Sequence, residues 1–169
     1  MENVIKLIHE FFSKGKLKYR YDEKTHTFSS GVDMENVLGN LRIVLPVREN
    51  SYTVYAILNG TPKAGNFGRV AEYLHRANYG MRNGNFEFDY RDGEIRYKTY
   101  VNFEGIQLSL PVVAESILIP ILMFDQYGEN LMRIMLGDGD PAELVKQAEA
   151  LDEDDETSGE LSSAAPPAQ

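Results

Sequence analysis

The chain contains no cysteine, and this absence excludes several kinds of chemistry. Without cysteine there is no disulfide, no thiolate nucleophile and no cysteine metal site. Histidine is also scarce, since only His9, His26 and His75 occur. None of them has a second histidine or a carboxylate at metal-ligand spacing within its predicted element. The sequence therefore predicts no bound metal and no cofactor.

Long apolar runs and basic charge are lacking as well. The longest nearly apolar run, Leu110 to Phe124, is interrupted by Pro120 and by polar residues, so we expect it to be too short to span a bilayer. The first residues lack the basic region of a signal peptide, which favours a cytoplasmic protein without a membrane partner. Seven of the 26 acidic residues lie from Glu149 onward, where no basic residue occurs, so only −2 of the formal net charge of −9 belongs to residues 1–148. This nearly neutral body has no basic footprint for nucleic acid.

Motifs of catalysis are absent too. No Gly-x-Ser-x-Gly elbow occurs, and the loop Gly60–Asn66 has the glycine spacing of a phosphate loop without its lysine. Glu87 and Asp89 could form an acid/base pair, but the predicted cross-strand partners Lys98 and Arg96 would hold both carboxylates ionised. The sequence therefore predicts a protein that is not an enzyme.

Hydrophobic periodicity predicts four helices. The first ends at Gly15, the second lies between Asn66 and Gly80, the third lies between Ser109 and Gly137, and a short one runs from Asp140 to about Ala150. Alternation of apolar and polar residues predicts strands near residues 17–21, 25–29, 41–47 and 52–58. Pro46 in one of them argues for an edge strand or a bulge, because proline cannot donate to a central ladder.

Residues 85–101 carry the strongest structural signal, a hairpin with one charged and one aromatic face. Asp92-Gly93 predicts a two-residue type I′ turn, which fixes the register of the two strands. On the exposed face this register places Glu87 opposite Lys98 and Asp89 opposite Arg96. On the other face it buries Phe88 and Tyr97, which lie opposite each other.

Together these elements predict an α+β fold with an antiparallel twisted sheet of about five or six strands, flanked by three main helices. We expect a single domain over residues 1–150. Residues 151–169 are acidic and then rich in serine, alanine and proline, a composition that predicts a disordered tail.

The third predicted helix is apolar at nearly every position from Ile117 to Phe124. A helix lying on a sheet with its back in water would show only an apolar stripe. Its second side is therefore covered either by a second subunit or partner, or by the first helix. The candidate partner or dimer interface consists of Ile117, Ile121, Leu122 and Phe124.

A basic stretch follows the first helix. Lys14, Lys16, Lys18 and Arg20 could line one face from the end of that helix into the first strand. One interpretation is a solvated strand face, or lysines that keep an edge strand from pairing with other chains. The alternative is a dock for an acidic segment, such as Asp152–Glu156 of this chain.

Three short stretches carry a family resemblance: Arg-Ala-Asn-Tyr-Gly at 76–80, Gly-Asn-Phe-Glu at 84–87 and Asp-Gly-Glu-Ile-Arg-Tyr-Lys at 92–98. In them the chain resembles the YbjN-domain family of bacterial proteins, labelled as sensory transduction regulators. The resemblance implies a fold similar to type III secretion chaperones, with a helix, an antiparallel run of strands, a helix, a hairpin and a final helix. It implies no catalytic residues, and relatives that are homodimers and bind partner polypeptides along helix and sheet surfaces.

Residues and resemblance together predict a non-catalytic protein-binding adaptor, chaperone-like or regulatory, in the bacterial cytoplasm. Its predicted partners are an unidentified protein and a second copy of the chain. The alternative is a small-molecule sensor domain with a pocket between the sheet and the long helix.

Overall fold

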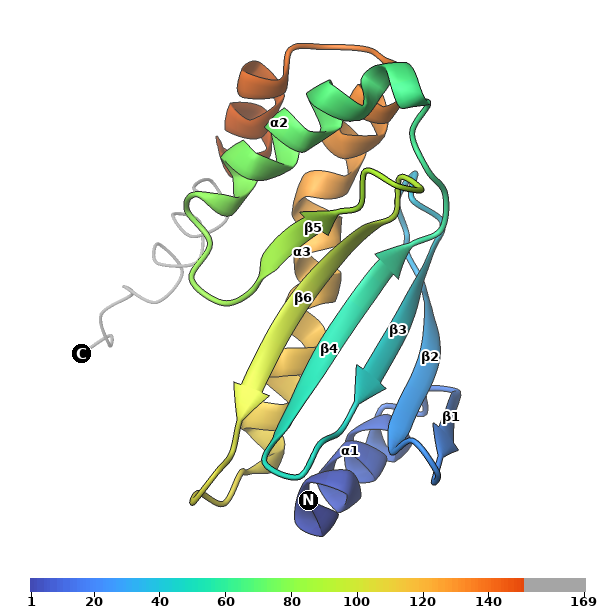
Figure 1. The fold of residues 1–169 in the computed structure, drawn as a ribbon, viewed down its shortest axis with the longest axis vertical. Coiled ribbons are helices and arrows are strands. Elements are labelled where there is room, and N and C mark those ends of the chain that lie inside the picture. Colours follow the sequence, from blue (N-terminus) through green and yellow to red (C-terminus); the bar gives the residue numbers. More distant parts are fainter. Residues whose placement is uncertain (151–169) are drawn as a thin grey trace, which may run out of the picture.

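The computed structural model describes residues 1–150, so the predicted tail at 151–169 lies outside the described residues. Six strands, three long helices and one 3-10 turn are arranged along this part of the chain (Figure 1). In order they are α1 (Glu2–Lys14), β1 (Tyr19–Asp22), β2 (Thr27–Asp33), β3 (Asn40–Pro46), β4 (Ser51–Leu58), η1 (Ala64–Asn66), α2 (Phe67–Asn78), β5 (Asn85–Phe88), β6 (Ile95–Asn102) and α3 (Leu110–Leu136). A further short helix covers residues 141–150.

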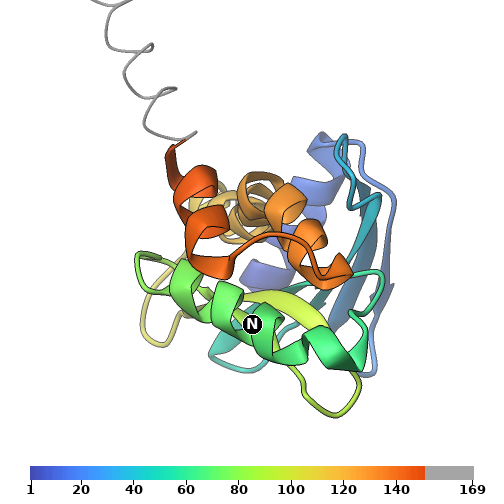
Figure 2. The same cartoon turned by 90° about the horizontal axis from the view of Figure 1, so that it is seen from above.

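The strands form one antiparallel sheet in the order β1-β2-β3-β4-β6-β5. β6 pairs with β4, so the shorter β5 lies at the edge. The sheet bends, and α1 and α3 lie on its inner face (Figure 2). The predicted α+β class, with six antiparallel strands and three main helices, is confirmed.

The helices bury the apolar faces that the sequence predicts. In α1, Phe12 is buried and its ring stacks on Tyr19 of β1 with 4.9 Å between the centroids. In α2, the buried Tyr73 hydroxyl donates to the carbonyl oxygen of Tyr127 in α3 at 2.9 Å. α2 and the helix at 141–150 lie together at one end of the sheet, near the C-terminal part of α3 (Figure 1).

The predicted helix ends are present, although not all of them are capped by side chains. Gly137 ends α3 in the left-handed conformation, with φ of 90°. Asp140 caps the last helix, because its Oδ1 accepts two backbone N–H groups of the first turn at 3.0 and 3.1 Å. Asn66 and Ser109 occupy their predicted N-cap positions without a side-chain capping bond. Asn66 instead donates to the carbonyl oxygen of Met135 at 2.9 Å, which ties α2 to α3.

Pro46 was expected to lie in an edge strand or at a bulge, and the first of these two alternatives is wrong. β3 is an internal strand, and Pro46, its last residue, lies opposite Thr27 of β2. On the other side the ladder to β4 ends at Val44 and resumes at the single Val47–Tyr52 bridge. The missing N–H of Pro46 coincides with this interruption, which explains why an internal strand tolerates it.

The predicted register of the β5–β6 hairpin is wrong by two residues. Glu87 lies opposite Arg96 rather than Lys98, and Phe86 lies opposite Tyr97. A shift of two residues leaves each side chain on its predicted face, because the side-chain period of a strand is two. Glu87 consequently still forms ion pairs with Lys98 and, at 2.7 Å, with Arg96.

The error comes from the turn. The Asp89 N–H donates to the carbonyl oxygen of Glu94 at 2.9 Å, which closes a loop of four residues instead of two. The Asp89 side chain accepts the backbone N–H of Arg91 at 2.8 Å and starts the turn early. Gly93 has a φ of 79°, but Asp92 does not adopt the positive φ that a type I′ turn requires.

The earlier turn also changes the burial of Phe88. Phe88 and Glu87 are both half-buried, so the prediction that Phe88 is buried is wrong, whereas Tyr97 is buried as predicted. The Phe88 ring lies at the rim of the sheet, edge-on to Phe67 and Tyr90 at 5.0 Å from each. Side chains at the end of a short edge strand have fewer neighbours to cover them.

Asn78 of α2 closes the β5 edge. Its Oδ1 accepts the Phe86 N–H at 2.7 Å, and its Nδ2 donates to the Phe86 carbonyl oxygen at 3.0 Å. One amide thereby satisfies both backbone groups of Phe86, which protects this edge from another strand. The preceding turn needs Gly84, whose φ is 89° and where a Cβ would lie 2.4 Å from the Lys98 carbonyl oxygen.

A buried polar network fixes α3 on the sheet at Pro120. Because proline has no N–H, the Ser116 carbonyl one turn earlier lacks its helical donor. The Thr99 hydroxyl of β6 donates to that carbonyl at 2.7 Å, and the Ser116 and Tyr52 hydroxyls are bonded at 2.8 Å. Ser116 also donates to the Val113 carbonyl at 2.8 Å. Burial raises the pKa of Tyr52, which keeps its hydroxyl neutral in this network.

This network predicts an energetic coupling between Thr99 and Pro120. Thr99→Val removes the donor and leaves the Ser116 carbonyl buried without a partner, which should lower the free energy of unfolding by about 1–3 kcal/mol. In a Pro120→Ala background the restored N–H can bond that carbonyl, so Thr99→Val should cost clearly less. Urea unfolding of the four proteins measures the coupling.

Thr53→Val provides the matched control, because Thr53 is half-buried on β4 and belongs to no part of this network. Its cost should be the same with proline or alanine at position 120. Equal costs of Thr99→Val in both backgrounds would show that Thr99 does not compensate for the proline.

Candidate functional site

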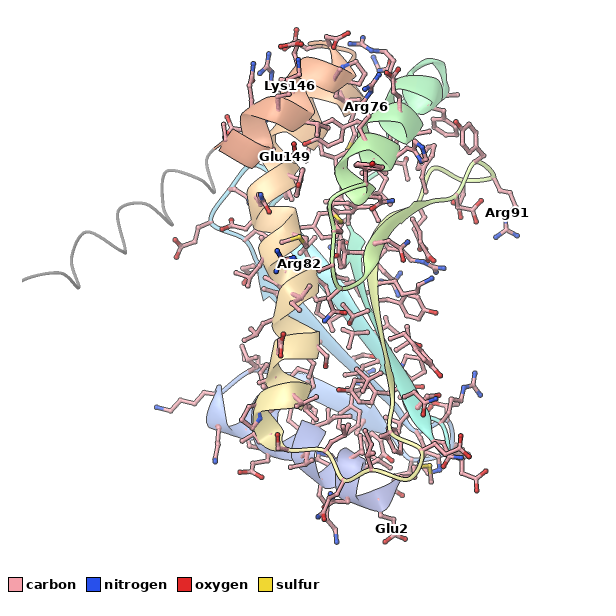
Figure 3. All side chains as sticks on the ribbon, turned by 90° about the vertical axis from the view of Figure 1, so that its left-hand side faces the viewer. Glu2, Arg76, Arg82, Arg91, Lys146 and Glu149 are labelled. Atoms are coloured by element: carbon pink, nitrogen blue, oxygen red, sulfur yellow. The ribbon has the colours of Figure 1, made fainter. Side chains whose placement is uncertain are left out.

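The side of α3 that faces away from the sheet carries an exposed apolar strip. Val112, Leu118 and Leu122 are 41, 43 and 56% exposed, and the half-buried Ile119 and Met123 lie beside them. With 3.6 residues per turn, these five positions form two neighbouring rows along the helix. We call them the α3 strip. Figure 3 shows the middle of α3 in front of the sheet, with no other described helix or strand across it.

The structure divides the four predicted interface residues between core and surface. Ile117 and Phe124 are 1% and 0% exposed. The Phe124 ring meets Phe86 of β5 edge-on at 5.2 Å. Ile121 is half-buried, and of the four only Leu122 is well exposed. Ile117 and Phe124 therefore face the sheet and cannot contact a partner, which corrects their assignment, while an interface on α3 itself stays a prediction.

The sequence could not make this division, because every candidate is apolar and the rotation of α3 about its axis is set by packing. It also missed the other four residues of the α3 strip, Val112, Leu118, Ile119 and Met123. The one usable signal is Ser116, a polar residue whose position marks the sheet side once its partners are known.

α3 is long and apolar enough to cross a membrane, judged by length and composition alone. The expectation of too short a run considered only Leu110 to Phe124, whereas the helix continues to Leu136. This is weak evidence for a membrane, because the core helix of a soluble protein passes the same test. The buried stripe of α3 packs on the sheet and holds the polar network described above.

A groove of about 370 Å³ lies beside the strip. It is lined by Gly80, Met81, Arg82, Met123, Gln126, Tyr127 and Glu149. Met81 and Met123 are half-buried, so the groove has an apolar floor beside the exposed Arg82. Within residues 1–150, no acidic side chain forms an ion pair with Arg82. Figure 3 shows Arg82 beside the middle of α3 and Glu149 above it, where the described chain ends.

The predicted basic stretch is exposed, but its residues differ in what they contact. Lys14 pairs with Glu10 one helical turn earlier at 2.7 Å. Lys16 has a φ of 52° in the connection from α1 to β1. Lys18 directly precedes β1, the other edge strand of the sheet, and Arg20 lies within it. Three exposed cations, at 16, 18 and 20, thus remain beside an open edge, and their role as a dock stays a proposal.

The carboxylates of the hairpin are held ionised, as the sequence predicts, but Asp89 is paired with Arg91 and not with the predicted partner Arg96. Partial burial would raise the pKa of Glu87, but hydrogen bonds from Lys98 and Arg96 hold that pKa below its usual value. Hydrogen bonds from the Arg91 guanidinium, and to a smaller extent from the Arg91 backbone N–H, lower the pKa of Asp89 to about 2. A general acid at neutral pH needs a raised pKa instead, so this pair is unsuited to acid/base chemistry.

Two of the histidines make structural contacts. The Nδ1 of His9 is hydrogen-bonded to the Tyr19 hydroxyl at 2.8 Å, and that of His26 to the Tyr21 hydroxyl at 2.9 Å. His75 is exposed on α2. In the part of the chain that the structure describes, no group of three or more His, Cys, Asp or Glu could hold a metal ion.

Comparison with known proteins leaves the family open. No protein-family model matches the chain. No curated protein matches it either. A solved structure, described as the crystal structure of the ExsC–ExsE complex, is similar with 17% sequence identity and a TM-score of 0.47, over 72% of this chain and 86% of that one. A similarity at this level carries no functional conclusion, so the fold assignment stands on this chain's own elements, and the resemblance to the YbjN-domain family stays a prediction.

The Asp89–Arg91 contact predicts a specific titration behaviour. The Asp89 carboxylate should titrate near pH 2, and Arg91→Gln should return its pKa toward 3.8. Because the pKa is lowered in the folded state, the contact favours folding above about pH 4 and loses this effect as the pH falls toward 2. Carboxyl chemical shifts followed by NMR between pH 1.5 and 6, on the order of ten points, would measure both values.

The matched control is Arg42→Gln, since Arg42 contacts Glu94 at 3.8 Å and does not contact Asp89. It should leave the Asp89 titration unchanged. An Asp89 pKa that is unchanged in Arg91→Gln would show that the Arg91 side chain is not what lowers it.

Proposed function

We propose that this chain is a non-catalytic protein-binding adaptor, chaperone-like or regulatory, that acts as a homodimer in the bacterial cytoplasm. The observation that carries the proposal is the α3 strip, where apolar side chains stay exposed on a helix whose opposite side is fully packed. Contiguous exposed apolar surface marks contact sites for other macromolecules. The described residues offer no metal cluster, and the hairpin carboxylates are held ionised, so binding explains the surface better than catalysis.

A small-molecule sensor is supported less well. Such a domain would need an apolar cavity between the sheet and α3, with a few convergent polar groups. The middle of that interface is filled by the buried side chains of Tyr52, Thr99, Ser116 and Phe124. The hydroxyls of the first three are already hydrogen-bonded to protein groups, so these three are not free to bind a ligand.

A second copy of the chain is the occupant we infer for the α3 strip. In a two-fold dimer the same surface of both copies meets itself. Leu118 and Leu122 lie one helical turn apart, the spacing with which side chains of one helix enter the grooves of another. The helix is 27 residues long, which is ample for such a crossing.

An acidic segment of the partner protein would fit the other candidate surface. Lys16, Lys18 and Arg20 are exposed next to the β1 edge, whereas Lys14 is already paired with Glu10. Exposed cations of this kind speed up association and select partners by charge more than they add affinity. Binding at this surface should therefore weaken markedly with salt.

Sedimentation at micromolar concentration tests the dimer. The parent protein should sediment as a dimer, and Leu122→Asp should sediment as a monomer because it places a charge in the contact. Leu136→Asp is the matched control: Leu136 is also on α3 and is 73% exposed, but it lies outside the strip. It should leave the dimer intact. A parent protein that is monomeric at this concentration would overturn the dimer and favour the sensor.

A further inference from the structure

We propose that residues 151–161 of the same chain bind the groove and the α3 strip in cis and so compete with the second copy. The regulatory part of this proposal rests on the proposed function, whereas the contact itself does not. Three observations support it: where the described chain ends, the charge at the groove, and the composition of the segment that follows.

The first observation is the end of the described chain. Glu149 lines the groove, so the described chain, which ends at residue 150, ends beside it. From there, 11 residues can extend roughly 36–40 Å. The strip from Met123 to Val112 spans only about 17 Å of helix. A segment of this length can therefore cover the groove and the strip without any movement of the domain.

The second observation is electrostatic. Arg82 at the groove has no acidic partner within residues 1–150, and five consecutive acids, Asp152–Glu156, begin three positions after Glu149. A cation beside an apolar floor attracts such a run more strongly than the same cation in open solvent, because part of the surrounding water is excluded. The complementarity also sets a direction, since the acids must pass Arg82 before the chain reaches the strip.

The third observation is the spacing of apolar residues in the segment. Leu151 precedes the acidic run and Leu161 follows it. Leu151 is two positions after Glu149, so in the proposed contact it would meet Met81 and Met123 of the groove, whose flexible thioether side chains adapt to varied partners. Leu161 can reach Leu122 within the length given above. The segment is apolar at Leu151, acidic in the middle and apolar again at Leu161. This order matches the surface, which offers the methionines of the groove, the Arg82 cation and the α3 strip.

Paramagnetic broadening tests the contact on the full chain. Because the chain has no cysteine, Asp155→Cys provides a single site for a nitroxide label. The ε-methyl signals of Met81 and Met123 should lose most of their intensity at low salt, whereas Met1, which directly precedes α1, should keep its own. Arg82→Gln should restore the two signals, and Lys18→Gln, the matched control, should not.

Other outcomes would overturn the contact. Broadening of the Lys16, Lys18 and Arg20 amides in place of the two methyls would mean that the segment binds the basic stretch. Broadening in a mixture of spin-labelled unenriched protein and unlabelled isotope-enriched protein would mean binding in trans. Absence of broadening would mean that the segment does not bind this face.

Sedimentation then tests the competition. Arg82→Gln releases the segment and should lower the dimer dissociation constant several-fold, although the added net negative charge would by itself weaken the dimer. A weaker or unchanged dimer would overturn the regulation. If the parent protein is monomeric but Arg82→Gln still removes the broadening, the cis contact is supported and only the proposed dimer fails. The two failures can therefore be told apart.

Discussion

The hydrogen bond from Thr99 to the Ser116 carbonyl is the contact on which the arrangement of α3 depends. It exists because Pro120 removes the helical donor of that carbonyl, and a buried carbonyl without a donor is costly. The Tyr52 hydroxyl adds a second polar contact from a neighbouring strand. Apolar packing is non-directional, so it would allow the helix to rotate. The polar network instead selects one rotation, because only one places Ser116 against both strands.

That rotation decides which apolar residues reach the surface. Ile117 and Phe124 point toward the sheet, while Leu118 and Leu122 point away from it. The exposed strip is thus a consequence of where the helix is fixed, together with an amino-acid composition that is apolar on both sides. A monomeric helix of this kind would ordinarily carry polar residues along its whole outer side. Here Leu118 and Leu122 are exposed between Glu115 and Asp125, and these exposed leucines are the physical reason to expect another polypeptide there.

The other surfaces differ in how many of their charged side chains and backbone groups are already paired within the chain. On the hairpin, Glu87 binds both Arg96 and Lys98, so this face has little unbalanced charge to offer a partner. The β5 edge is closed by Asn78, whereas no side chain within residues 1–150 closes the β1 edge in this way, and exposed cations lie beside it. Binding is therefore favoured along α3 and beside β1.

The sequence by itself determined the elements and their order, because helix and strand periods, glycine ends and the Asp140 cap are local properties. It also determined that the hairpin carboxylates stay ionised, since a register error of two residues does not move Glu87 to the other face. Local rules failed at Asp92-Gly93, where the Asp89 side chain binds the Arg91 N–H and starts the turn early. Only the tertiary structure decided how α3 is rotated and that Arg82 lies beside it. Both depend on contacts between segments distant in sequence, and chain periodicity cannot rank apolar residues that are equally hydrophobic.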